Sequence, residues 1–220
     1  MRAFLIGMFL AGLAAAAPAV AGPWPRAPGG AFVSGSVGTE GHAGRRARIA
    51  EVYAEYGLTR RLTLGGHLHL TRATRRGDIF ARWHPDLPGP TALGLTLGGR
   101  FDSARDPRLA PLLAVHLGRG AETRLGNLWA RVDLRAVGSR EGLGGIAEME
   151  LTGQLGLRTE AGALAMLTLS EYRDRHGATR KLIPALGHAI GARSTLVLSA
   201  TTLPRERRLD GFTLSLWQAF

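Results

Sequence analysis

Three features of the sequence predict an all-β protein, an antiparallel transmembrane β-barrel of about 12 strands that follows a cleaved signal peptide. The chain begins with an apolar run and a small-residue cleavage site, apolar residues then recur at every second position, and the alternating segments are even in number. Most segments are close to the roughly nine to eleven residues that a tilted strand needs to cross a bilayer. A barrel of ten strands and a soluble β-sandwich are the alternative folds.

The N-terminal segment has the order of a secretory signal peptide. Met1 and Arg2 give a positive start, residues 3–17 are apolar, and Ala19-Val20-Ala21 form a small-x-small cleavage site. The apolar run is shorter than the roughly 20 residues of a spanning helix, which disfavours a membrane anchor. The expected organisation is a signal peptide over 1–21, a proline-rich periplasmic leader over 22–30 and the β-barrel over 31–220.

Beyond residue 30 the alternation defines the strands in order. In the segment 62–71, Leu64 and Leu68 share one face while His67 and His69 share the other, and a period of two is typical of strands. Later segments repeat the pattern, with an aliphatic face throughout and a charged or polar face that continues at mid-strand. The expected strands lie near 31–38, 48–57, 62–71, 78–84, 91–101, 109–118, 125–136, 145–156, 162–172, 178–190, 194–202 and 210–220.

Glycines and connectors agree with a closed sheet. Gly65 and Gly98 are two of several glycines that lie inside the segments, where a curved sheet uses glycine to bend. With the N-terminus taken as periplasmic, the turns at 58–61, 157–161 and 191–192 are short, and most connectors of the opposite set are longer and polar. Short periplasmic turns and longer outer loops are typical of outer-membrane barrels.

Composition narrows the classes of function. The 220 residues suit one domain, and the absence of cysteine excludes disulfides, thiolate metal sites and cysteine nucleophiles. Lys+Arg outnumber Asp+Glu by 28 to 17, and every base except Lys181 is arginine. Codon bias and selection for anion binding explain this excess equally well. Nucleic acid is not an expected partner, because the bases are scattered over loops and the chain is exported.

The last segment places Phe212, Leu214, Leu216 and Phe220 on one face. In this it resembles the bacterial outer-membrane β-barrel superfamily, and the resemblance implies an outer-membrane location and an assembly signal read by the barrel-assembly machinery. Gln218 departs from the apolar residue usual two positions before the end.

A second resemblance covers eleven residues, Glu55-Tyr56-Gly57-Leu58-Thr59-Arg60-Arg61-Leu62-Thr63-Leu64-Gly65. This strand-turn-strand looks like a hairpin of uncharacterised transporter-like outer-membrane barrels, including those similar to phenol-degradation pathway barrels. It supports the architecture and says little about solutes.

If the aliphatic faces contact lipid, the opposite faces line the lumen. Two interpretations of these residues remain open, a solute-selective constriction and an internal ion-pair network that fills a narrow barrel. The lumen-lining candidates are Glu51, Tyr53, Glu55, His67, His69, Arg82, Arg100, Arg131, Asp133, Arg135, Glu148 and Glu150.

Two hairpins allow the strand register to be predicted. Folding about residues 58–61 sets Glu51 near His69 and Tyr53 near His67. Folding symmetrically about Arg140 sets Arg131 opposite Glu150 and Asp133 opposite Glu148, where cross-strand ion pairs would add stability.

Catalytic and metal chemistry have weaker support. His67 and His69 project to one face, but two imidazoles without a third ligand are poor evidence for a metal, and no cofactor is expected. Outer-membrane lipid hydrolases of the phospholipase and lipid A deacylase types pair a histidine with a serine two residues on, which none of the seven histidines has. A lipid-modifying enzyme is therefore the least favoured hypothesis.

Arginine clusters occupy the loops assigned to the outside. Guanidinium groups bind phosphate bidentately, so these loops are candidates for binding lipopolysaccharide and for attracting small anionic solutes. The leading functional hypothesis is a small passive channel or transport-related barrel, and the alternative is a closed structural or surface-binding barrel. The lipopolysaccharide-binding candidates are Arg45, Arg46, Arg75, Arg76, Arg205, Arg207 and Arg208.

Overall fold

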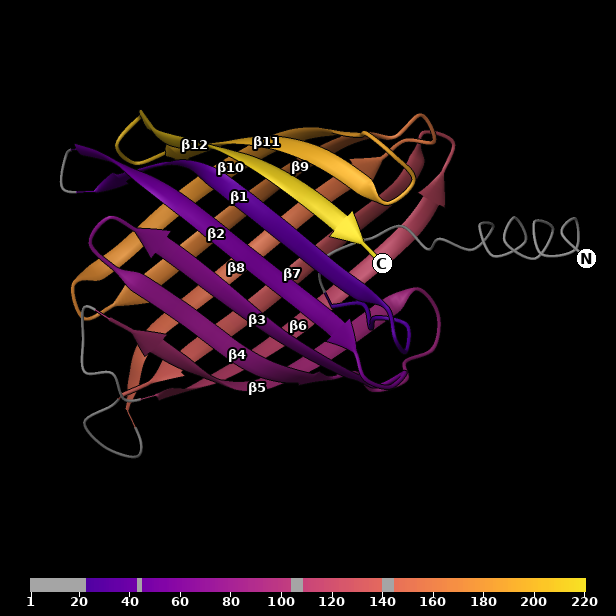
Figure 1. Cartoon of the computed structure of the whole chain (residues 1–220), viewed down its shortest axis with the longest axis horizontal. Helices are drawn as coiled ribbons and strands as arrows, with labels where there is room; N and C mark the ends of the chain where they lie inside the picture. The colour runs from indigo at the N-terminus through magenta and orange to yellow at the C-terminus, as the bar shows by residue number, and fades with distance from the viewer. Residues whose placement is uncertain (1–22, 43–44, 104–108, 140–144) are drawn as a thin grey trace, which may run out of the picture.

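The computed structural model describes residues 23–42, 45–103, 109–139 and 145–220. The expected signal peptide over 1–21 lies outside these residues. The described chain forms one closed barrel of 12 antiparallel strands in sequential order (Figure 1). The prediction of a 12-strand barrel is confirmed, and the ten-strand barrel and the sandwich are wrong. None of the described residues forms a helix long and apolar enough to cross a membrane.

The strands agree with the predicted segments, and most run further at the end opposite the chain termini. Their bounds are β1 (Ala31–His42), β2 (Arg45–Gly57), β3 (Leu62–Thr71), β4 (Arg75–Trp83), β5 (Thr91–Asp102), β6 (Ala110–Thr123), β7 (Gly126–Gly138), β8 (Ile146–Arg158), β9 (Ala163–Asp174), β10 (Gly177–Ala189), β11 (Ser194–Leu203) and β12 (Arg208–Ala219).

The first and last strands close the barrel. β1 pairs with β12 in a continuous register from Phe32↔Ala219 to Gly38↔Thr213. The barrel therefore has one end where β1 begins and β12 finishes, which we call the termini end, and an opposite end, which we call the loop end. At the termini end the connector 84–90 is longer than the short turns expected there, and the turn expected at 157–161 lies at 159–162 because β8 continues to Arg158.

The two faces of the wall differ in chemistry. The outward face is aliphatic, with Ile79, Leu97 and Leu186 exposed by 62%, 65% and 70%. The inward face carries buried charged side chains such as Asp78 and Arg100. An apolar outer band and a polar interior suit a barrel surrounded by lipid.

One predicted register is confirmed and the other is wrong. β2 and β3 pair Glu51 with His69 and Tyr53 with His67, as the tight turn between them predicts. In β7 and β8, Arg131 lies opposite Gln154 and Asp133 opposite Thr152, so neither meets its expected partner. This hairpin is not symmetric about Arg140, which lies outside the described residues, and a register shift follows Val137.

Candidate functional site in the barrel lumen

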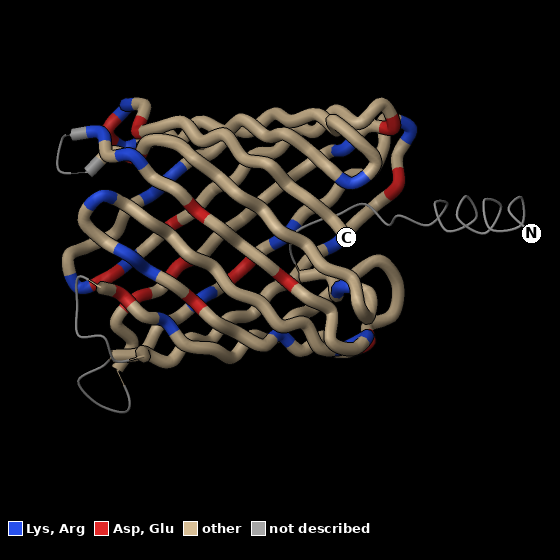
Figure 2. The backbone as a smooth tube through the Cα atoms, viewed as in Figure 1, with Lys and Arg blue, Asp and Glu red and all other residues tan. Residues whose placement is uncertain are grey.

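The lumen has a charged wall and an uncharged wall. The charged wall consists of the inward residues of β2 to β8 and contains all 12 lumen-lining candidates. The uncharged wall comprises the inward residues of β9 to β12 and β1, among them Met166, Ala185, Ser199, Ser215 and Ser36. Charged residues enter this wall only near the loop end, where Lys181 pairs with Glu40. Figure 2 shows the same division, with charges along the strands from β2 to β8 and few at the middle of β10 to β12.

A buried ion-pair cluster occupies the charged wall in the half of the barrel nearer the loop end. Arg100 Nε donates to Asp78 Oδ1 at 2.6 Å, and Arg100 Nη1 donates to Glu148 Oε2 at 2.8 Å. Arg135 pairs with two carboxylates, through Nη1 with Asp78 Oδ2 at 3.1 Å and through Nη2 with Glu150 Oε2 at 2.5 Å. The cluster connects β4, β5, β7 and β8, so it braces strands that are not neighbours in the sheet. At this level of the barrel the arrangement favours an internal ion-pair network over a solute-selective constriction.

A second cluster lies closer to the termini end. Arg82 Nη1 donates to Glu55 Oε1 at 2.7 Å, and Arg26 Nε donates to Glu55 Oε2 at 2.7 Å. The Tyr53 hydroxyl also donates to Glu55, and the Arg82 guanidinium lies 5.1 Å from the centre of the Phe80 ring. Gly65 leaves the space for that ring, because a Cβ there would lie 2.3 Å from Phe80 Cζ. This in-strand glycine thus accommodates an aromatic side chain.

A third group of charged side chains, from β1, β2, β3 and β10, is more accessible than these two clusters. His69 Nδ1 lies 2.8 Å from Glu51 Oε1, and Lys181 Nζ donates to Glu40 Oε1 at 2.7 Å. The side chains of His67 and Glu51 are 31% and 32% exposed, in contrast with 0% for Glu55. Solvent therefore reaches the lumen beside His67 and Glu51. Among the described residues no group of three or more possible ligands is arranged to hold a metal ion.

The leader lies inside the barrel at the termini end. Pro23 is buried, and its carbonyl accepts a hydrogen bond from His84 Nδ1 at 3.0 Å. Trp24 packs against an apolar cluster of Trp129, Leu164, Ala185 and Val197 from β7, β9, β10 and β11. Gly118 of β6 makes room for it, since a Cβ there would lie 2.3 Å from Pro23 Cγ. Together with the Arg26–Glu55 pair, these contacts reach most of the circumference.

Sequence reasoning placed residues 22–30 as a leader and missed this docking. The segment has no strand period, and prolines suit an extended passage. The only local signal was Trp24, a large apolar side chain in a segment otherwise typical of a linker.

The arginines that are not part of luminal ion pairs lie mainly at the two ends of the barrel. Arg26, Arg76, Arg82, Arg100, Arg131 and Arg135 each have a carboxylate within ion-pair distance. Of the lipopolysaccharide-binding candidates, Arg46, Arg75, Arg205, Arg207 and Arg208 are exposed at the loop end. Arg76 instead faces the lumen and donates to Asp102 at 3.1 Å. For Arg45 the structure describes the backbone and not the side chain.

A closed antiparallel barrel with an apolar exterior and a charged interior is the fold of bacterial outer-membrane porins. The KdgM porin superposes with a TM-score of 0.68 at 7% identity, covering 86% of this chain and 99% of that chain. The NanC porin superposes with a TM-score of 0.61 at 10% identity, covering 86% and 98%. No protein-family model and no curated protein matches the sequence. At these identities the likeness establishes the fold.

Proposed function

We propose that this chain is an outer-membrane transport barrel for small solutes, with its loop end outside the cell and its termini end in the periplasm. The observation that carries the proposal is a polar lumen that solvent reaches at Glu51, His67 and His69, enclosed by a wall whose outer face is aliphatic. The last strand supports the location, because Phe212, Leu214 and Leu216 face outward in the pattern proposed as the assembly signal.

Small anionic solutes are the class that the charge distribution favours. The exposed loop-end arginines would raise the local concentration of anions at the entrance. A KdgM porin of the same fold has been solved in complex with disordered oligogalacturonate, which makes an anionic solute a reasonable class for this barrel. The luminal ion pairs would then act mainly as structural bracing.

The docked leader makes the resting barrel a poor conductor. Its removal should open the termini end, because Pro23, Trp24 and Arg26 fill space between the walls there. Single-channel currents are therefore to be recorded from the refolded chain 22–220 and from a leader-free chain 31–220, in planar bilayers with a salt gradient. We expect small or rare steps from the first chain and larger, anion-selective steps from the second.

A closed barrel that binds ligands on its surface is the second candidate, and the buried ion-pair network favours it. Both chains would then fold, as judged by their heat-dependent mobility in gels, and neither would conduct. Such silence from folded protein would contradict the transport proposal. Nothing in the described residues favours the lipid-modifying enzyme.

A further inference from the structure

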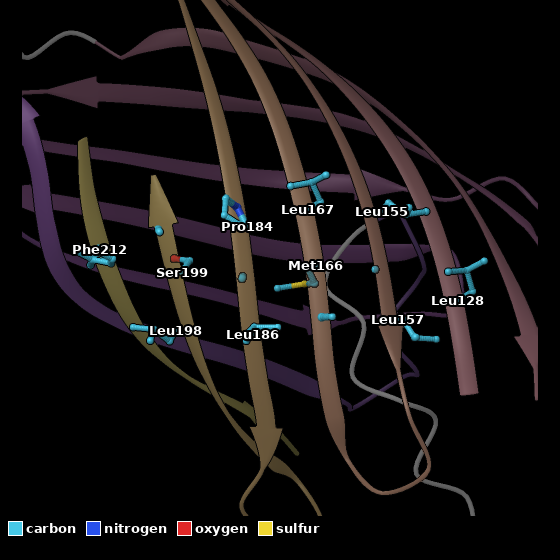
Figure 3. Close-up of a pocket in the computed structure, with 14 residues that line it drawn as sticks. Leu128, Leu155, Leu157, Met166, Leu167, Pro184, Leu186, Leu198, Ser199 and Phe212 are labelled. Carbon is cyan, nitrogen blue, oxygen red and sulfur yellow. The ribbon is translucent and has the colours of Figure 1, made fainter. Parts of the chain in front are cut away.

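A groove crosses the lipid-facing surface of the wall from β7 to β12. Its volume is about 670 Å³, and Leu155, Leu167 and Leu186 rise from its sides in Figure 3. The small side chains of Ala165 and Ala200 keep it open. The lining also includes Met166, Ala185 and Ser199, which belong to the inward-facing set. The groove therefore reaches down to the backbone of the strands.

The wall is also weakly hydrogen-bonded at the groove. Pro184 of β10 has no N–H to donate, and no residues are paired in the described β10–β11 ladder between Leu182↔Thr202 and Ala185↔Ser199. The Leu182 carbonyl instead accepts from the Thr202 hydroxyl at 3.0 Å. A register shift at Thr201/Thr202 disturbs the next ladder, between β11 and β12. In a membrane, unpaired backbone groups cost free energy, so this seam is a weak line in the described wall.

The luminal side of the seam suits an apolar molecule. Met166, Ala185 and Val197 face the lumen there beside the docked Trp24, Ser199 follows them toward the loop end, and the charged clusters lie on the opposite wall. A molecule that crosses the seam would thus leave a surface without charges and enter an apolar groove. The docked leader covers the part of the seam nearer the termini end, so a solute would reach the seam from the loop-end side.

We propose that the β10–β11 seam is a lateral opening through which single-chain amphiphilic anions, such as medium-chain carboxylates, pass between the lumen and the hydrocarbon region of the membrane. The apolar chain of the solute occupies the groove, and the loop-end arginines attract its carboxylate at the entrance. This inference rests on the proposed transport function and names its solute class and exit.

The absence of cysteine allows the seam to be locked specifically. Ala185 and Ser199 are opposite each other across it, so Ala185→Cys with Ser199→Cys would form a disulfide on oxidation. The matched control is Ser36→Cys with Ser215→Cys, which lie across the β1–β12 seam with their Oγ atoms 2.8 Å apart. Cells producing each variant are assayed for uptake of radiolabelled decanoate, oxidised and then reduced.

Oxidation of the variant with Ala185→Cys and Ser199→Cys should lower decanoate uptake by about tenfold, which a barrier higher by roughly 1.4 kcal/mol would give. Reduction should restore uptake, and the control pair should show no change. A second variant, Pro184→Ala, restores a backbone donor at the seam and should also slow uptake. Pro111→Ala, at the in-strand proline of β6, is its control.

The outcomes separate this inference from the transport proposal. Equal decanoate uptake with the Ala185–Ser199 link formed and reduced would overturn the lateral opening, while single-channel currents from the same protein would leave the transport proposal standing. If the protein gave neither uptake nor currents in any form, including the leader-free chain, both would be overturned.

Discussion

At the scale of single residues, Arg100 shows how strongly the luminal pairs depend on one another. Its guanidinium is 3% exposed and contacts Asp78 and Glu148, whose side chains are 4% and 5% exposed. Removing one member of such a group leaves buried charge without its partner, whereas a fully exposed ion pair contributes little.

Replacing Arg100→Leu should therefore lower the free energy of unfolding by about 3–5 kcal/mol. Urea titration of the refolded barrel in lipid vesicles measures the change. Arg124→Leu removes the same charge from an exposed turn and should have almost no effect. Equal unfolding midpoints for the two variants would show that the buried cluster does not brace the barrel.

His84 should make the docking of the leader depend on pH. It follows β4, and burial lowers the pKa of its imidazole below the ordinary value of 6.5, with the nearby Arg82 guanidinium acting in the same direction. The Pro23 carbonyl opposes this shift. The other charged or titratable neighbours of the ring are Glu55, which raises its pKa, and His116, which lowers it.

Because the folded state favours the neutral imidazole, docking should be unaffected above the ordinary pKa and should weaken as the pH falls through and below about 6.5. We expect channel openings to become more frequent from pH 7.5 to about pH 5.5. The His84→Asn variant should lose this dependence. If its currents changed with pH as much as those of the parent chain, His84 would not be the responsible group.

At the scale of elements, the leader and β6 form one packing unit. Gly118→Ala would place a Cβ 2.3 Å from Pro23 Cγ, so the leader would be displaced while the strand kept its register. Gly153→Ala is the matched control, since nothing lies within 4 Å of a Cβ there.

We expect Gly118→Ala to reproduce the larger currents of the leader-free chain and Gly153→Ala to behave as the parent chain. A protease-accessibility assay on residues 23–30 provides an independent measurement of undocking. Unchanged currents and unchanged cleavage in Gly118→Ala would contradict the packing argument.

Strand positions were predictable because alternation records which side chains face outward from the barrel. The β2–β3 register was predictable as well, since a short turn fixes which residues meet. The β7–β8 register was not, because a longer connection leaves the turn position free and Arg135, rather than Arg131, meets Glu150. Links such as Arg100 to Glu148 join β5 to β8 and depend on barrel curvature, which no local pattern of residues encodes.

At the scale of the whole molecule, the basic loop end should determine ion preference. Replacing Arg205, Arg207 and Arg208 together by Gln should reduce anion selectivity and lipopolysaccharide binding. Replacing Arg119, Arg124 and Arg193 removes the same charge from exposed positions at the termini end and should change both much less.

Reversal potentials of the leader-free chain and retention on immobilised lipopolysaccharide measure the two effects. The difference in selectivity should shrink as salt rises, since charges further apart than about 10 Å are largely screened at 0.1 M ionic strength. Unchanged lipopolysaccharide binding in the loop-end variant would rule out these arginines as the phosphate-binding groups.

The pairing of β1 with β12 also constrains how the barrel is made. These strands are separated by ten others in the sequence, so their contacts have the largest sequence separation in the sheet and form late and slowly. Until β12 arrives, the free edge of β1 is a template for unwanted pairing with another chain. The fold therefore couples completion of the chain to protection against aggregation, because only the arrival of β12 covers that edge.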